Sequence, residues 1–123
     1  MAGDKKKIIV VDDNPENLSV LKNTLKDKYT VFPILSAAEM FELLEHVKPD
    51  LILLDVEMPE MSGYEAAVKL KGDDKLKEII FIFLTSRDDE ESTKKGFSLG
   101  AVDYIPKPIV VPVLLERIEK HLS

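Results

Sequence analysis

The 123-residue chain contains no cysteine and only two histidines, His46 and His121. The absence of cysteine excludes disulfide bonds, thiolate nucleophiles and cysteine-type zinc sites, and two histidines are too few for a histidine-rich metal site. No apolar stretch approaches the ~18 residues that a membrane-spanning helix requires, and the first residues, MAGDKKK, lack the apolar segment of a signal peptide. We therefore expect a cytoplasmic protein that does not enter a membrane.

Positive charge is also scarce, because 17 Lys and Arg stand against 23 Asp and Glu, for a net charge of −6. Binding to nucleic acid requires clustered basic side chains, so we expect none by this chain. The only basic run, Lys5-Lys6-Lys7, is typical of a solubilising flank ahead of a strand. With 45% hydrophobic residues, the chain has the size of one domain with its own core. We predict a single domain over residues 1–123, with a flexible flank at 1–5.

Apolar runs of strand length alternate with amphipathic stretches of helix length along the chain. This alternation is typical of βαβ units and predicts an α/β fold with a parallel sheet. The predicted strands cover residues 6–12, 29–35, 50–55, 79–84 and 101–105, and a helix follows each of them. Leu18, Leu21 and Leu25 recur at helical spacing and give the first helix one buried stripe.

Residues that begin or end helices lie between these segments. A favourable N-cap, a proline in the first turn or a terminal glycine marks each predicted boundary. The predicted markers are Asn14-Pro15 for the first helix, a capping box from Ser36 to Glu39 for the second, Gly72 at the end of the third, Asp88 and Gly100 around the fourth, and Pro112 in the last.

Polar side chains follow four of the predicted strands at the point where each ends. Asp12-Asp13 follow IIVV, Asp55 follows LILL, Thr85 follows IIFIFL, and Lys107 follows AVDYI. Because the carboxyl ends of parallel strands share one edge of a sheet, these side chains are expected to converge where open α/β sheets bind ligands.

Such a constellation suits phosphoryl transfer. A carboxylate that closes a strand, Asp55, can accept a phosphoryl group as an acyl phosphate. Neighbouring Asp12 and Asp13 would hold a cation, and oxygen-only ligands suit Mg²⁺. The Lys107 ammonium and the Thr85 hydroxyl could contact the phosphoryl oxygens. Taken singly, each residue also has a purely structural interpretation, for example two aspartates that stabilise the start of the first helix.

Four motifs in this order resemble the receiver domain of two-component response regulators over nearly the whole chain. They are VDDNP, the D-x-x-M-P of Asp55 to Pro59 followed by Met61 and Gly63, Leu84-Thr85-Ser86, and the G-A-x-D-Y-x-x-K-P of Gly100 to Pro108. The resemblance implies a flavodoxin-like (βα)5 three-layer sandwich whose five-stranded parallel sheet has the order 2-1-3-4-5.

The resemblance also implies roles for individual residues. Asp55 takes a phosphoryl group from a histidine kinase or phosphotransfer domain, with Thr85 and Lys107 as the other catalytic residues. Mg²⁺ is bound by Asp12, Asp13, Asp55 and the main-chain carbonyl of Glu57. The peptide bond between Lys107 and Pro108 is expected to be cis. The protein would then catalyse its own phosphorylation and dephosphorylation without turning over an external substrate.

Partners follow from the same resemblance. Asn14, Asn17, Val20 and Ile109 are our predicted contacts for the phosphohistidine donor. Phosphorylation is expected to switch the surface of the fourth helix, fifth strand and fifth helix through Tyr104. An output domain, attached or separate, and a homodimer that forms on phosphorylation are further expected partners. The sequence identifies neither the kinase nor the output.

Two details distinguish this chain within the resemblance. Val102 replaces the first aspartate of a G-A-D-D-Y pattern, and the chain is more similar to receivers attached to cyclic-dinucleotide enzymes or hybrid kinases. Glu57 and Arg87 lie two residues after Asp55 and Thr85, and we predict that they approach each other and slow hydrolysis of the acyl phosphate.

Three alternatives remain at this stage. A phosphatase of the haloacid dehalogenase type requires aspartates spaced D-x-D, whereas Asp12 and Asp13 are adjacent. A nucleotide or flavin binder would have a glycine-rich or hydroxyl-rich loop after the first strand, and DDNPEN is neither. The main alternative is a pseudo-receiver, a docking module that acts without phosphorylation.

Overall fold

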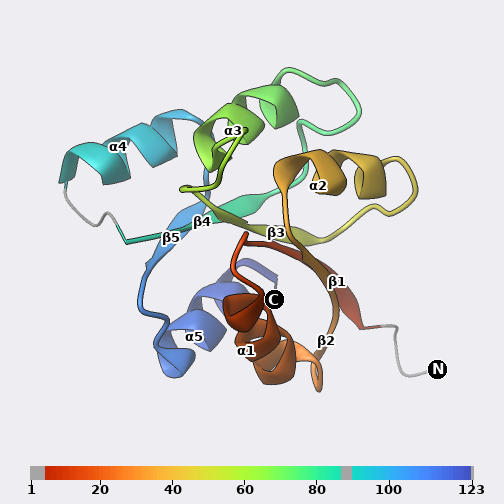
Figure 1. Cartoon of the computed structure of the whole chain (residues 1–123), viewed down its shortest axis with the longest axis vertical. Coiled ribbons are helices and arrows are strands. Elements are labelled where there is room, and N and C mark those ends of the chain that lie inside the picture. The colour runs from red at the N-terminus through yellow and green to blue at the C-terminus, as the bar shows by residue number, and fades with distance from the viewer. Residues whose placement is uncertain (1–4, 87–89, 123) are drawn as a thin grey trace.

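The computed structural model describes residues 5–86 and 90–122. Within them, five parallel strands form one sheet of order β2-β1-β3-β4-β5 (Figure 1), which confirms the predicted flavodoxin-like α/β fold. The elements in chain order are β1 (Lys6–Val11), α1 (Pro15–Leu25), β2 (Tyr29–Ile34), α2 (Ala37–Leu44), β3 (Leu51–Asp55), α3 (Gly63–Lys71), β4 (Phe81–Thr85), α4 (Glu90–Ser98), β5 (Asp103–Pro106) and α5 (Val111–Leu122).

Helices cover both faces of the sheet, so the molecule has three layers. Helices α1 and α5 lie on one face, and α2, α3 and α4 lie on the other (Figure 1). Every residue of β3 and β4 is buried, as expected for central strands of a parallel sheet. The predicted stripe of Leu18, Leu21 and Leu25 is buried beneath α1, and Leu114 and Ile118 of α5 join the same cluster.

The helix boundaries follow from local side-chain chemistry. The Asn14 side chain accepts hydrogen bonds from two N–H groups at the start of α1, which confirms the predicted cap. Ser36 caps α2, but its hydroxyl, not its N–H, meets the Glu39 carboxylate. A reciprocal capping box that we did not predict joins Ser62 and Glu65 at the start of α3.

Both predicted helix-ending glycines are confirmed, but they act differently. Gly72 follows α3 with an ordinary φ of −84°. Gly100 follows α4 with a φ of +103°, a conformation that side chains disfavour. Pro112 is the second residue of α5, as predicted.

Two strands begin two residues later than predicted, and β3 begins one residue later, at Leu51. β4 begins at Phe81 and β5 at Asp103, two residues later in each case. A turn explains the late start of β4, because the Ile79 N–H donates to the Leu76 carbonyl instead of joining the sheet. The predicted Asp88 cap and residues 1–4 of the predicted flank lie outside the described residues.

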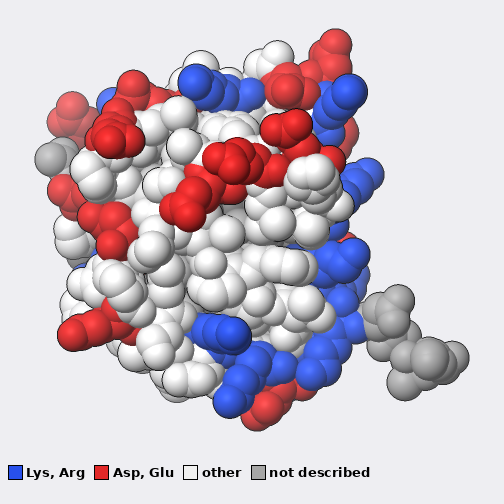
Figure 2. Space-filling view, turned by 45° about the vertical axis from the view of Figure 1, so that its right-hand side comes forward, with Lys and Arg blue, Asp and Glu red and all other residues white. Residues whose placement is uncertain are grey.

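Basic side chains gather at one corner of the molecule. Figure 2 shows Lys and Arg clustered toward the lower right, near the start of β1, and Asp and Glu above them. There, the Lys5 Nζ donates to the Lys26 carbonyl at 3.1 Å. This corner lies at the end of β1 opposite Asp12, about 20 Å away at 3.3 Å per residue. None of the helices in the described part of the chain is long and apolar enough to span a membrane.

Candidate functional site: an acidic pocket at the carboxyl edge of the sheet

The register of the sheet brings the predicted site residues to one edge. Val11 pairs with Leu54, so Asp12 and Asp55 are the next residues on their strands. Asp55 pairs with Leu84, the residue before Thr85, and Thr85 pairs with Pro106, the residue before Lys107. Because all four strands are parallel and nearly in register, residues far apart in sequence end side by side.

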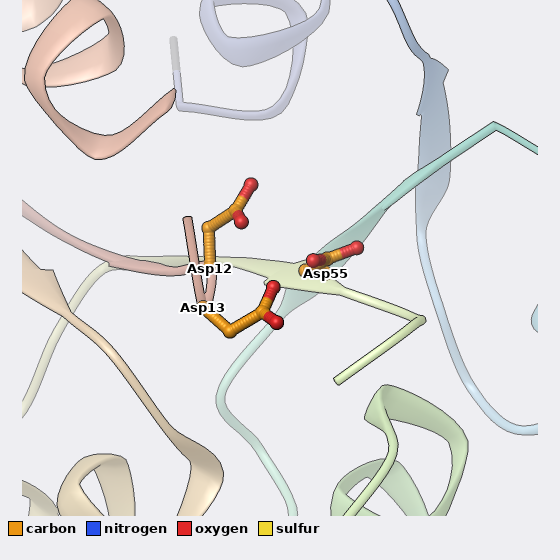
Figure 3. A group of neighbouring side chains, drawn as sticks. All are labelled: Asp12, Asp13 and Asp55. Atoms are coloured by element: carbon orange, nitrogen blue, oxygen red, sulfur yellow. The ribbon is translucent and has the colours of Figure 1, made fainter. Parts of the chain in front are cut away.

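Three carboxylates form the centre of this site. Asp12, Asp13 and Asp55 each offer one oxygen atom, and these atoms lie within 4.8 Å of one another. Figure 3 shows Asp12 and Asp13 on the segment after β1, with Asp55 beside them at the end of β3. Asp12 and Asp55 are 1% and 2% exposed, whereas Asp13 is exposed. A cluster of carboxylate oxygens open to water on one side is a donor set that suits Mg²⁺.

Lys107 supplies a positive charge to this cluster. Its Nζ lies 3.1 Å from Asp12 Oδ2 and 3.1 Å from Asp55 Oδ1. The Lys107 N–H donates to the Thr85 carbonyl at 2.8 Å, which continues the β4–β5 pairing past the end of β5. The peptide bond between Lys107 and Pro108 is cis, as predicted. We call Asp12, Asp13, Asp55 and Lys107 the acidic pocket.

The electrostatics of the acidic pocket disfavour the charged form of Asp55. Burial and then the charge of Asp12 raise the pKa of Asp55 to about 6, and the Lys107 ammonium and the Glu57 N–H offset only part of this rise. Burial alone would lower the pKa of Lys107, but the carboxylates of Asp55 and Asp12 outweigh it and raise that pKa. The pocket would therefore accept a further cation favourably.

Two asparagines at the N-terminus of α1 hold Asp12 in place. The Asn14 N–H donates to Asp12 Oδ1 at 2.9 Å, and the Asn17 side-chain amide donates to Asp12 Oδ2 at 3.2 Å. Sequence reasoning assigned Asn17 only to the contact with the phosphohistidine donor. The five-residue separation of Asp12 and Asn17 across a helix N-terminus was the available signal for this contact.

Glu57 lies beside the acidic pocket. Its N–H donates a hydrogen bond to Asp55 Oδ1 at 3.3 Å, which places the Glu57 main chain next to Asp55. Its carboxylate accepts a hydrogen bond from the Ser86 hydroxyl at 2.9 Å. The predicted partner of Glu57, Arg87, lies outside the described residues.

Gly63 is a structural requirement that the motif contained but that sequence reasoning did not explain. A Cβ added to Gly63 would lie 2.3 Å from the Asp55 carbonyl oxygen and 2.9 Å from Val56 Cα. The Gly63 N–H also donates to the Val56 carbonyl at 2.8 Å. Only a residue without a side chain lets α3 begin this close to the strand end that carries Asp55.

Thr85 and Tyr104 both line a small hollow beneath α4, together with Gly96 and Phe97. Thr85 is 5% exposed. The Tyr104 ring is half-buried and meets the Phe97 ring edge-on, with 6.2 Å between the ring centroids. The predicted switch residue is therefore in contact with α4 and adjoins the acidic pocket through Thr85.

Comparison with known protein families identifies the arrangement. Residues 8–119 match the model of the response regulator receiver domain. The chain belongs to this family. Phosphorylation on an aspartate is general among its members, and they generally bind Mg²⁺ at an acidic pocket.

Individual relatives agree with this family. The chain is 35% identical to the polar-differentiation response regulator DivK of Brucella anthropi over 122 residues, which covers 96% of this chain and 97% of DivK. It is 40% identical over 116 residues to a probable cyclic di-GMP phosphodiesterase of Vibrio cholerae, covering 94% of this chain. The chain spans only 26% of that relative's length.

Solved structures show the same fold. The chemotaxis protein CheY4 of Vibrio cholerae superimposes with a TM-score of 0.91 at 26% identity, covering 97% of this chain and all of CheY4. The receiver domain of a signal transduction histidine kinase from Syntrophus aciditrophicus gives a TM-score of 0.87 at 34% identity, with 96% and 90% covered. This receiver domain thus functions in two-component signalling, and the pseudo-receiver alternative is not favoured.

Proposed function

We propose that Asp55 is the phosphoryl acceptor of this receiver domain. The observation that carries the proposal is the convergence of three carboxylates and one ammonium at the carboxyl edge of the sheet. Lys107 and the Glu57 N–H both contact Asp55 Oδ1, so we assign Oδ2 as the attacking oxygen. It forms a bond to phosphorus while the bond from phosphorus to the donor imidazole nitrogen breaks, and the electron pair returns to that nitrogen.

The bound metal would be Mg²⁺, held by the carboxylates of Asp12, Asp13 and Asp55 and the main-chain carbonyl of Glu57. Mg²⁺ supplies positive charge that neutralises the phosphoryl oxygens during transfer. Asp13 is exposed, so it keeps the pocket open toward solvent and toward a docking donor.

Lys107 and Thr85 are the other catalytic residues in this proposal. The Lys107 ammonium lies within reach of both Asp12 and Asp55, so a short movement would bring it to a phosphoryl oxygen. The Thr85 hydroxyl would donate a hydrogen bond to the same group. Lys107 and Thr85 would make these contacts with the phosphoryl group both in the transition state and in the phosphorylated product. The protein would therefore catalyse its own phosphorylation and would not turn over an external substrate.

Phosphorylation would be transmitted through the hollow beneath α4. Because Thr85 and Tyr104 line that hollow together, a movement of Thr85 toward the phosphoryl group would open space for the Tyr104 ring. The contact between Tyr104 and Phe97 would then change, along with the surface formed by α4, β5 and α5. A separate or attached output domain, or a second copy of the phosphorylated chain, would recognise that surface.

The phosphohistidine donor would dock beside the acidic pocket. A depression there is lined by Asn17, Val20, Leu21, Ser86, Lys107, Pro108 and Ile109, which include three of the four contacts predicted from sequence. Val20 is 54% exposed, so an apolar donor surface could bury it. Receiver domains of two-component systems interact with histidine kinases or phosphotransfer proteins, and we propose such a donor in the cytoplasm for this single domain.

The test is intact-mass spectrometry after incubation with acetyl phosphate and Mg²⁺. Wild type should gain one phosphoryl group, the gain should require Mg²⁺, and Asp55→Asn should show none. Asp27→Asn, which removes an exposed carboxylate outside the pocket, is the matched control and should be labelled like wild type. Labelling of Asp55→Asn would contradict the assignment, and absence of labelling in folded wild type by both acetyl phosphate and a histidine kinase would revive the docking-module interpretation.

A further inference from the structure

Asn17 makes a contact with the acidic pocket that the proposed chemistry does not use. Its side-chain Nδ2 donates to Asp12 Oδ2 at 3.2 Å. The same oxygen accepts a hydrogen bond from the Lys107 ammonium at 3.1 Å, and Oδ1 accepts one from the Asn14 N–H at 2.9 Å. Asp12 is therefore fixed by three donors, two of them from the α1 N-terminus and one from the loop after β5.

These three donors differ in what they can do when the site is occupied. The Asn14 N–H is part of the backbone and stays in place. Lys107 is shared with Asp55 and, under the proposed function, moves toward the phosphoryl group. Asn17 is thus the side chain that can keep Asp12 Oδ2 oriented after Lys107 has left it.

We propose that Asn17 is a positioning residue that holds the Asp12 carboxylate in the orientation required for Mg²⁺ binding. This inference rests on the proposed function. A carboxylate ligand is ordinarily oriented by a hydrogen bond from a neighbouring group, and loss of such a partner typically weakens metal binding 10–100-fold. An amide is suited to this role because it carries no net charge, so it stabilises the carboxylate without repelling the incoming cation.

The local structure supports a fixed position for Asn17. It lies in the first turn of α1, where its own N–H donates to the Asn14 side chain at 3.4 Å, and it is partly buried. The Asn14 cap therefore sets where α1 begins, and α1 in turn aims the Asn17 amide at Asp12. The same residue also lines the proposed docking depression, so positioning of Asp12 and contact with the donor are two separable roles.

The experiment compares Asn17→Ala with Asn23→Ala, an exposed asparagine on the same helix that serves as the matched control. Titration calorimetry with MgCl₂, without any phosphoryl donor, measures the dissociation constant for Mg²⁺. Asn17→Ala should raise it about tenfold, and Asn23→Ala should leave it unchanged. Thermal unfolding in EDTA verifies that both variants fold, as expected because alanine favours helix more than asparagine does.

A second measurement separates the two roles of Asn17. At limiting Mg²⁺, Asn17→Ala should accept phosphoryl groups from acetyl phosphate more slowly than wild type, and raising the Mg²⁺ concentration should narrow that difference, because the excess metal compensates for the weaker site. If Mg²⁺ affinity is unchanged and only transfer from a histidine kinase slows, the positioning role is wrong and Asn17 is a docking contact alone. If wild type itself neither binds Mg²⁺ nor is labelled, the proposed function fails together with this inference.

Discussion

Two clusters that combine buried carboxylates with basic side chains lie near opposite ends of β5. They differ in the balance between negative and positive charge. At its carboxyl end, the acidic pocket brings three carboxylates to one ammonium within the described part of the chain. At its start, Asp103 contacts Arg117 Nη1 and His121 Nε2, each at 3.0 Å. Arg117 also donates to the Tyr104 carbonyl. We call Asp103, Arg117 and His121 the β5–α5 cluster.

The difference indicates which cluster is a binding site. In the β5–α5 cluster, each Asp103 oxygen meets a side chain that can carry positive charge, so the group is complete and ties α5 to the sheet. In the acidic pocket, the carboxylates exceed the positive charge, and burial together with the charge of Asp12 raises the pKa of Asp55. A buried group that is balanced stabilises the fold, whereas one left with excess charge is prepared for a ligand.

The largest expected effect comes from removing charge from the acidic pocket. The double variant Asp12→Asn and Asp13→Asn should weaken Mg²⁺ binding about 100-fold or more, because these carboxylates are proposed ligands. Loss of a residue that only supports a ligand already weakens metal binding by about 10–100-fold. Titration calorimetry would measure the loss. Unchanged affinity in the folded double variant would show that the charge imbalance does not mark the metal site.

The second-largest expected effect is a loss of stability when a side chain is added to the backbone at Gly63, beneath the acidic pocket. Gly63→Ala should destabilise the protein by about 3 kcal/mol, because the new Cβ would overlap the Asp55 carbonyl and neither backbone can yield. Gly72→Ala is the matched control, since its Cβ would meet nothing closer than 3.3 Å, and it should change the stability by less than about 1 kcal/mol. Urea unfolding measures both, and equal stabilities would contradict the close approach.

The β5–α5 cluster should respond in the opposite sense from the acidic pocket. Asp103→Asn leaves Arg117 and His121 without their shared carboxylate and should cost about 2 kcal/mol of stability. This is below the 3–5 kcal/mol typical of a broken buried pair because both partners are partly exposed. Mg²⁺ affinity should stay at the wild-type value. A change in metal affinity without a loss of stability would reverse our interpretation of the two clusters.

The comparison also shows what could be predicted from sequence. The strand order was implied by the resemblance to receiver domains. The convergence of Asp12, Asp55 and Lys107 follows from apolar runs that end in polar residues, because parallel strands place their ends at a common edge. The Asn17 contact was not predicted, because the spacing of Asp12 and Asn17 permits the contact but does not determine the angle at which α1 leaves the edge. The predicted starts of β4 and β5 were wrong by two residues for a similar reason. Turns that form in the folded chain, and not local composition, decide where strand pairing begins.

The β5–α5 cluster was missed for a related reason. Asp103 was recognised only as part of a motif, and Arg117 and His121 lie one helical turn apart on a helix whose packing the sequence does not specify. Spacing along α5 could have suggested that both face one partner. It could not have identified that partner as a buried aspartate at the start of β5.

The smallest expected effect is the pH dependence of stability without metal. The pKa of Asp55 is raised to about 6 in the folded protein, above its value near 3.9 in an unfolded chain. Between these values the folded state binds more protons than the unfolded state, so stability falls as the pH rises from about 4 to 6. We expect a loss on the order of 1–2 kcal/mol, reduced from the full shift because Asp55 interacts with the neighbouring charges of Asp12 and Lys107.

Urea unfolding of wild type and Asp55→Asn in EDTA at several pH values would measure this loss. The difference in stability between the two proteins isolates the contribution of Asp55 from those of the other ionisable groups. Mg²⁺ should abolish the fall in wild type, because a bound cation favours the charged carboxylate and lowers its pKa. A wild-type stability that instead rises relative to Asp55→Asn over this range would mean that Lys107 already neutralises the acidic pocket, and the contrast with the β5–α5 cluster would then disappear.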